Sequence, residues 1–191
     1  MAEGKLFYVV GPSGSGKDSL IRYARRRLGS DPGVVFAHRY ITRPVELNGE
    51  NHIALTEAEF DARLAAGLFA MHWASHGWRY GIGLEINLWL AKGCNVVMNG
   101  SREYLPEARR LYATLKAILI TVSPEILAER LRARGRETED QIAERIARAR
   151  AFMPPEEGDL EIIQNDSELE IAGERLVQLL AVAAPSSPAF A

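Results

Sequence analysis

Short apolar runs alternate with longer amphipathic stretches along most of the chain. The runs rich in β-branched and aromatic residues predict buried strands at 6–10, 34–40, 95–98, 117–122 and 160–164. Apolar residues at helical spacing predict helices at 18–28, 56–66, 84–91, 103–115 and 169–180, and from 124 to about 152 with a break near Gly135. Strands and helices that alternate at this spacing indicate an α/β protein with a parallel central sheet.

Three segments show neither the apolar runs of strands nor the helical spacing of apolar residues. Residues 43–51 are polar and contain glycine, 67–80 are aromatic and basic, and 182–191 have the composition of a disordered tail. Thr56 and Glu59 form the sequence pattern of a capping box at the start of the second helix. Because there is no internal repeat and no long linker, we expect one domain over 1–181.

Composition narrows the possible classes. Hydrophobic residues make up 47% of the 191 positions and charged residues 25%, as in globular proteins. The formal net charge of -2 argues against bulk nucleic-acid binding, and the single cysteine, Cys94, excludes a disulfide within the chain. The N-terminal apolar run is too short for a signal peptide or a membrane span, so we expect a cytoplasmic protein without a membrane partner. Its oligomeric state stays open.

A glycine-rich loop follows the first predicted strand and precedes the first predicted helix. Its residues are Gly11, Pro12, Ser13, Gly14, Ser15, Gly16, Lys17, Asp18 and Ser19. Backbone N–H groups of such a loop and the positive end of the helix cradle phosphates, and Lys17 reaches the β- and γ-phosphates. The alternative is a glycine turn that merely joins strand to helix, but spacing, context and lysine favour a phosphate loop. We therefore predict an ATP-dependent kinase that uses Mg²⁺.

The position after Lys17 departs from the phosphate-loop pattern. A serine or threonine whose hydroxyl binds Mg²⁺ is usual there, whereas this chain has Asp18 followed by Ser19. A carboxylate is a hard ligand, so Asp18 and Ser19 are candidate magnesium ligands. Equally, Asp18 could sit in the first helical turn because the helix dipole stabilises a carboxylate there. Both interpretations stand.

Motifs further along the chain occur in the order found in guanylate kinases. They are Thr42-Arg43-Pro44, Gly49 to His52, Tyr80-Gly81, Arg134-Gly135-Arg136 with Arg145, and Asn165-Asp166. This resemblance implies a P-loop NTPase three-layer fold of the nucleoside-monophosphate-kinase type, with an acceptor-binding insertion at about 38–88 and a lid at about 125–153. It also implies that Arg134 and Arg145 are catalytic contacts to the ATP phosphates and that Asn165 belongs to the adenine pocket. Arg136 is a neighbour of these lid positions that could assist them as a further nucleotide contact. For the lid arginines, a charged helix pair is the other interpretation.

The guanine-reading positions of that family are altered here. Arg39, Glu46, His52, Asn99 and Ser101 stand where guanylate kinases carry base-reading, phosphate-binding or acidic side chains. A site built to hydrogen-bond a base rejects it when those partners are lost. The segments GPSGSGKDS, RYITRP, ENHIAL, GLFAMHW, HGWRYGI and VVMNGSREYLPEA more closely resemble the ribose 1,5-bisphosphate phosphokinases of phosphonate degradation. That family makes 5-phosphoribosyl 1-diphosphate from ribose 1,5-bisphosphate and ATP.

A site that binds a sugar bisphosphate needs cationic side chains at both ends of the ligand, one group for each phosphate. The candidate acceptor-binding residues are Arg39, Arg43, His52, Arg79, Tyr80 and Arg102, with His76 as a further donor. For each arginine the alternative is a solvated surface charge. The nucleophile is an anionic phosphate oxygen, so the reaction needs no general base. Because Asn99 and Ser101 replace the acidic strand end, we hypothesise that the magnesium-directing carboxylate has moved to Asp18.

Other functions remain open at this stage. One is a kinase of another small phosphorylated acceptor, including a guanylate kinase. The other is an inactive binding module, against which the intact loop and the lid arginines argue. Trp73, Trp78 and Trp89 are interpreted as packing residues.

Overall fold

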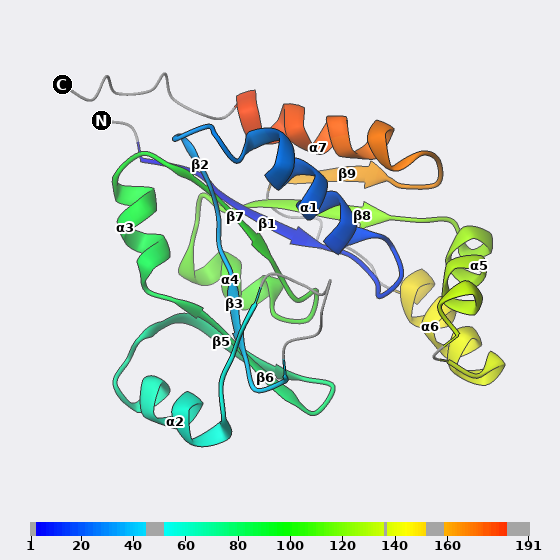
Figure 1. The fold of residues 1–191 in the computed structure, drawn as a ribbon, viewed down its shortest axis with the longest axis horizontal. Coiled ribbons are helices and arrows are strands. Elements are labelled where there is room, and N and C mark those ends of the chain that lie inside the picture. The colour runs from blue at the N-terminus through cyan, green and yellow to red at the C-terminus, as the bar shows by residue number, and fades with distance from the viewer. Residues whose placement is uncertain (1–2, 45–51, 136, 152–158, 183–191) are drawn as a thin grey trace.

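The computed structural model describes residues 3–44, 52–135, 137–151 and 159–182 (Figure 1). Of the predicted features, Arg136, most of the loop at 43–51, the last residues of the lid and nearly all of the C-terminal tail lie outside the described residues. No helix in the described ranges is long and apolar enough to cross a membrane.

A five-stranded parallel sheet forms the centre of the molecule. Its strands lie in the order β2 (Val34–Phe36), β7 (Asn95–Asn99), β1 (Leu6–Val10), β8 (Lys116–Thr121) and β9 (Leu160–Gln164). All four pairings are parallel. Every residue of β1 is buried, as expected for a central strand covered on both faces. The predicted α/β class and parallel sheet are confirmed.

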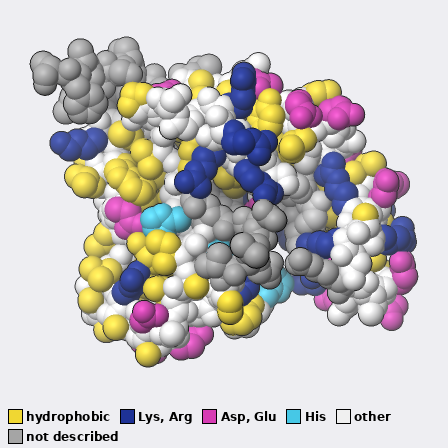
Figure 2. Space-filling view, in the orientation of Figure 1, with side chains coloured by type: hydrophobic (Ala, Val, Ile, Leu, Met, Phe, Trp, Pro, Cys, Tyr) yellow, Lys and Arg dark blue, Asp and Glu magenta, His cyan; other side chains and the backbone are white. Residues whose placement is uncertain are grey.

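Helices cover both faces of this sheet and give three layers. On one face, α1 (Lys17–Leu28) and α7 (Leu169–Val182) lie side by side and pack Leu20, Ala24 and Leu176 onto Phe7 and Ile163. On the other face lie α3 (Glu85–Ala91) and α4 (Leu105–Leu111). The outer side of α1 carries exposed arginines, which form a dark blue group in Figure 2. The amphipathic pattern of α1 thus decides which side faces the sheet.

A second, four-stranded sheet lies below the first in Figure 1. Its order is β4 (His52–Ala54), β3 (Arg39–Ile41), β6 (Trp78–Gly83) and β5 (Phe69–Ser75), with α2 (Glu57–Ala65) packed beside it. The single strand predicted at 34–40 is wrong, because Phe36 pairs with Val97 in the first sheet whereas Arg39 pairs with His52 in the second. The segment 67–80, left without regular structure by the sequence, contributes to the β5–β6 hairpin.

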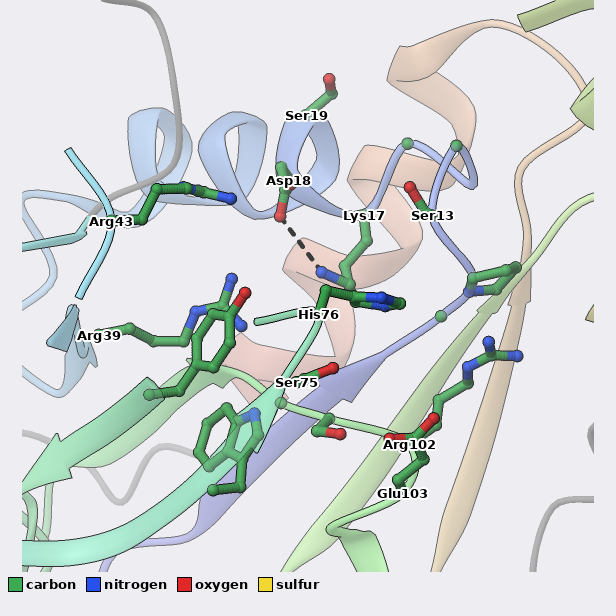
Figure 3. Close-up of a pocket in the computed structure, with 18 of the residues that line it drawn as sticks. Ser13, Lys17, Asp18, Ser19, Arg39, Arg43, Ser75, His76, Arg102 and Glu103 are labelled. Atoms are coloured by element: carbon green, nitrogen blue, oxygen red, sulfur yellow. Dashed lines mark hydrogen bonds and ion pairs between the residues drawn. The ribbon is translucent and has the colours of Figure 1, made fainter. Parts of the chain in front are cut away.

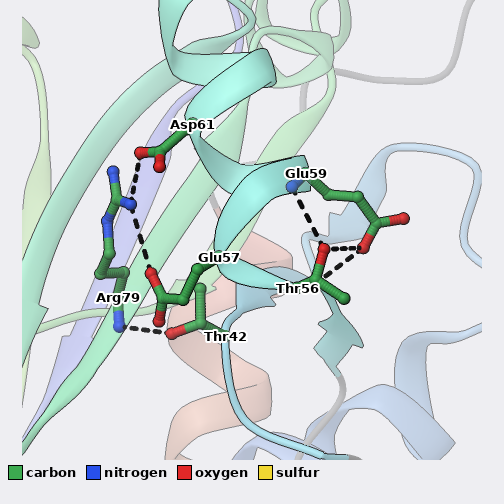
Figure 4. A network of polar contacts seen from close by, with 6 residues as sticks. All are labelled: Thr42, Thr56, Glu57, Glu59, Asp61 and Arg79. Carbon is green, nitrogen blue, oxygen red and sulfur yellow. Dashed lines mark hydrogen bonds and ion pairs between the residues drawn. The ribbon is translucent and has the colours of Figure 1, made fainter.

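Local signals set several helix ends. The capping box is confirmed: Thr56 Oγ1 accepts from the Glu59 N–H at 3.2 Å, and the Thr56 N–H donates to Glu59 Oε2 at 2.7 Å (Figure 4). The helix predicted at 103–115 is shorter, since Tyr112 leaves the helical region at φ -130°. The predicted break is confirmed at Gly135, whose φ of 66° ends α5 (Pro124–Arg134) before α6 (Glu139–Ala151) begins.

Candidate active site

A cavity of about 550 Å³ opens at the carboxyl ends of β1 and β7 (Figure 3). The phosphate loop forms one wall, with Gly11, Pro12, Ser13, Gly14, Gly16, Lys17, Asp18 and Ser19. The second sheet contributes another wall, the loop after β7 a third, and α5 a fourth. Ligands of open parallel sheets bind at this edge, where the strand order changes direction.

Two glycines of the phosphate loop have left-handed backbone conformations. Gly14 and Gly16 have φ values of 95° and 83°, which side chains rarely adopt. A Cβ on Gly14 would lie 2.7 Å from Leu127 Cδ1, and one on Gly16 would lie 2.4 Å from Asn165 Nδ2. The loop therefore presses directly against α5 and against the end of β9. Its backbone curls in front of the N-terminus of α1, where the helix dipole favours an anion.

Two of the predicted nucleotide contacts lie behind the loop. Asn165 is 1% exposed, and its Nδ2 donates to the backbone oxygen of Ser15 at 2.7 Å. Ser15 is itself fully buried. Neither lines the cavity. In this structure the Asn165 side chain braces the loop, and its contact with the nucleotide stays a prediction. The neighbouring Asp166 accepts from the Ser123 N–H at 2.7 Å and so fixes the start of α5.

Lys17, Asp18 and Asn99 form one hydrogen-bonded group across the loop and the end of β7. Lys17 Nζ donates to Asp18 Oδ1 at 3.2 Å (Figure 3). It also donates to Asn99 Oδ1 at 2.5 Å, and Asn99 Nδ2 donates to the same Asp18 oxygen at 2.7 Å. Desolvation works to raise the pKa of Asp18, but the charges of Lys17 and Arg39 and the two hydrogen bonds outweigh it and lower the pKa. The carboxylate is therefore ionised at neutral pH.

Tyr8 holds the loop that follows β7 in place. No motif in the sequence indicates this role. The Tyr8 hydroxyl donates to the Ser101 oxygen at 3.1 Å and accepts from the Ser101 N–H at 3.0 Å. Burial raises the pKa of this fully buried tyrosine. A Cβ on Gly100 would lie 2.1 Å from the Tyr8 ring. The loop can therefore approach the strand only with glycine at this position, which brings Arg102 to the cavity.

Four of the predicted acceptor contacts line the cavity: Arg39, Arg43, Tyr80 and Arg102. The Arg39 guanidinium lies over the Tyr80 ring, 5.1 Å from its centroid. Burial lowers the pKa of Arg102, so an anion beside it would relieve the cost of its charge. Arginines from two separate segments, β3 with the residues after it and the loop after β7, thus meet on the side of the cavity facing the phosphate loop.

Trp73 both packs and lines the cavity. Its ring stacks on Tyr80 with centroids 5.5 Å apart and on Tyr104 with centroids 5.4 Å apart. The packing interpretation is therefore right but incomplete, because the same side chain forms part of the cavity wall.

Arg79 and His52 do not line the cavity, so its geometry gives no support to their predicted contacts with the acceptor. Successive residues of a strand face opposite sides, so Arg79 points away from the side occupied by Tyr80. Its Nη1 lies 2.6 Å from Asp61 Oδ1 and 3.3 Å from Glu57 Oε2 (Figure 4). Its guanidinium also covers the Phe60 ring. His52 is 9% exposed, with Nε2 3.3 Å from the Arg43 oxygen, and so supports the backbone of Arg43.

The lid helices bring one predicted arginine to the cavity. Arg134 lines it, and Arg130, one turn earlier on α5, lines it as well and lies 3.4 Å from the Ser15 oxygen. Helical spacing from Arg134 was the signal that would have indicated Arg130. Arg145 does not line the cavity; it pairs with Glu137 at 3.3 Å. Arg134 binds the same carboxylate, whose side chain is 5% exposed.

The donor set near the loop suits a magnesium ion shared with a nucleotide. The described residues hold no cluster of three or more histidine, cysteine, aspartate or glutamate ligands, as a complete protein-bound metal site would require. Asp18 and Ser19 instead offer hard oxygen atoms beside the phosphate loop. Magnesium in kinases takes few protein ligands and completes its shell with phosphate oxygens and water. The residues present fit such an ion.

Comparison with known proteins defines the class. The model of the AAA domain family matches residues 8–152. The solved guanylate kinase of Anaplasma phagocytophilum superposes with a TM-score of 0.68 at 18% identity, covering 97% of this chain and 89% of that one. Fold and phosphate loop therefore define a P-loop nucleotide-binding protein with guanylate-kinase-like architecture.

Curated relatives narrow the class to one family. The chain is 78% identical to ribose 1,5-bisphosphate phosphokinase PhnN of Thiobacillus denitrificans over all 191 residues, the full length of both. A protein of the same name from Psychromonas ingrahamii is 56% identical over 94% of this chain and 91% of its own. The chain belongs to the ribose 1,5-bisphosphate phosphokinase family.

Proposed function

We propose that the protein transfers the γ-phosphoryl group of ATP to the 1-phosphate of ribose 1,5-bisphosphate, in phosphonate breakdown. The products are 5-phospho-α-D-ribose 1-diphosphate and ADP. The observation that carries this proposal is the shared cavity: Arg39 and Arg43 from one segment and Arg102 from another line the same space as the phosphate loop. Guanidinium groups bind phosphate oxygens in pairs, so this wall suits an acceptor with two phosphates.

The chemistry asks the protein for alignment and charge neutralisation. An anionic oxygen of the 1-phosphate attacks the γ-phosphorus, and the bond from that phosphorus to the β–γ bridging oxygen breaks as ADP leaves. No proton is transferred. Most of the barrier is then lowered by holding the two reactants in line and by neutralising their negative charge. Lys17, held in the cavity by Asn99 and Asp18, is placed to meet the phosphates on the ATP side.

Magnesium would supply the remaining positive charge when it is bound with ATP. In our proposal Asp18 and Ser19 hold it, directly or through water. The contact between Asp18 and Asn99 supports the hypothesis that the carboxylate moved from the strand end to the loop, because the two positions lie within one hydrogen bond, 2.7 Å. The competing role, a carboxylate that simply stabilises the first turn of α1, predicts no effect on magnesium.

The two parts flanking the phosphate loop receive separate roles in this proposal. The region 38–88 binds the acceptor through Arg39, Arg43 and Tyr80. The region 125–153 acts as a lid, and its arginines contact the ATP phosphates. A hydrophobic cluster of its own, with Leu127, Leu131 and Ile142, supports the lid role, since the helix pair can then move as a unit. The cytoplasmic location remains a prediction.

Release of ADP from MgATP tests the proposal when it is measured with ribose 1,5-bisphosphate, with GMP and without acceptor. We expect turnover that depends on ribose 1,5-bisphosphate and a background rate in the other two reactions. Turnover with GMP alone would indicate a guanylate kinase, and no stimulation by either acceptor would indicate a binding module. Either result contradicts the proposal.

A further inference from the structure

The tip of the β5–β6 hairpin carries an unusual residue into the active-site cavity. Ser75 pairs with Trp78, so His76 and Gly77 form a two-residue turn. Their φ values are 50° and 77°, and His76 is the one non-glycine residue with positive φ in the described part of the chain. Turns of this kind favour asparagine, aspartate or glycine at the first position. Histidine is therefore not the residue that the turn itself would select.

Packing does not account for His76 either. The residue is exposed on the protein surface, in contrast to the buried Met71 and Tyr80 of the same hairpin. Its side chain lines the cavity together with Lys17 and Asp18. Figure 3 shows His76 reaching from the hairpin toward the side of the cavity where Lys17 lies. A residue of the second sheet thus faces the phosphate loop of the first.

We propose that His76 is a further catalytic residue whose imidazole N–H donates a hydrogen bond to the phosphoryl group in transfer. The inference rests on the proposed function, because it assigns His76 to the same reaction. Negative charge spreads over the outer oxygens of this group as it moves between ADP and the acceptor. A donor that reaches the same space as Lys17 from the second sheet stabilises that charge. The hydrogen bond transfers no proton, so the balance of the reaction is unchanged.

The backbone conformation explains how the donor is held in place. The positive φ of His76 belongs to a two-residue turn, and the pairing of Ser75 with Trp78 closes this turn. The turn thus fixes the direction in which the Cα–Cβ bond of His76 leaves the backbone, at the rim of the cavity that His76 lines. Strained backbone is retained where a side chain is needed in one place, at some cost in stability. We therefore expect that replacing His76 by a residue that suits the turn maintains or raises stability but lowers activity.

The test replaces His76 by the two residues that suit the turn. In His76→Asn and His76→Gly we expect a melting temperature equal to or above that of the wild type. We expect kcat to fall by about a hundredfold to a thousandfold, the order seen when one transition-state donor is removed. His72→Asn is the matched control, because His72 is an exposed histidine of the same hairpin outside the cavity lining. Its kcat should stay at the wild-type value.

A binding measurement separates this inference from the proposed function. Aluminium fluoride with ADP and Mg²⁺ mimics the phosphoryl group in transfer, and no acceptor is needed. We expect both His76 variants to bind this mimic about tenfold more weakly and ADP alone as well as the wild type does. Wild-type affinity for the mimic overturns the inference, as does a fall in melting temperature that parallels the loss of activity. A wild type inactive on ribose 1,5-bisphosphate that still binds the mimic through His76 overturns only the proposed function.

Discussion

The Asn165 amide gives the sharpest prediction from the fold, because it was expected to contact the nucleotide and is found to brace the loop. In Asn165→Ala the buried 2.7 Å hydrogen bond to the Ser15 oxygen is lost, which leaves that oxygen to the longer contact from Arg130 at 3.4 Å. An under-satisfied buried acceptor and the space left by the amide together cost about 3 kcal/mol. For a chain of this length each kcal/mol lowers the melting temperature by about 2–4 °C, so we expect a fall of roughly 6–12 °C.

Calorimetric unfolding measures that fall, and nucleotide titration shows its cause. Gln164→Ala is the control, since the exposed Gln164 side chain hydrogen-bonds to Asp166 at the surface and its loss should change stability little. A brace for the loop weakens ATP and GTP binding equally when it is removed. If Asn165→Ala instead melts like the wild type and loses its discrimination between ATP and GTP, the side chain reads the base and the bracing role is wrong.

Two other predictions concern the walls of the cavity and the metal. Arg39→Ala should lower kcat/KM for ribose 1,5-bisphosphate by about 10- to 100-fold, the worth of a charged hydrogen bond, whereas Arg79→Ala should leave it near the wild-type value; equal losses in steady-state assays would contradict the opposite orientations of these side chains. Asp18→Ser should raise the Mg²⁺ concentration for half-maximal activity by about tenfold, much more than Ser19→Ala does, and equal mild effects would rule out the magnesium role. The lowered pKa of Asp18 sets the pH dependence: the carboxylate is ionised above its ordinary pKa of about 4. Apparent Mg²⁺ affinity should therefore stay level down to about pH 5 and weaken only as the pH falls through the lowered value; a transition near pH 6 would contradict it.

Features encoded by neighbouring residues were predictable from the sequence. The phosphate loop, the capping box of Thr56 and the helix break at Gly135 each depend on a few consecutive residues, and the structure has all three. The central sheet was predictable because its buried strands are continuous apolar runs. The prediction of a single strand at 34–40 was wrong for the same reason. A continuous strand-like run of residues does not show the point at which the chain passes from one sheet to the other.

Features that depend on distant partners were not predictable. The sequence does not show that Asn165 reaches Ser15, or that Tyr8 binds the backbone of Ser101. The β5–β6 hairpin had a usable signal in the sequence, because His76-Gly77 ends in the glycine typical of two-residue turns and lies between two aromatic-rich runs. Recognising it would also have separated the inward Tyr80 from the outward Arg79. The predicted acceptor side therefore contained the right residue types, but the side that each one faces required the strand register.

The central claim concerns which phosphate receives the γ-phosphoryl group, and phosphorus NMR of the reaction mixture tests it directly. With MgATP and ribose 1,5-bisphosphate, we predict that the 1-phosphate signal disappears and a pair of coupled diphosphate signals on C1 appears together with ADP, while the 5-phosphate signal is retained. An unchanged 1-phosphate signal in the presence of active protein, with GDP formed when GMP is supplied, would contradict the account.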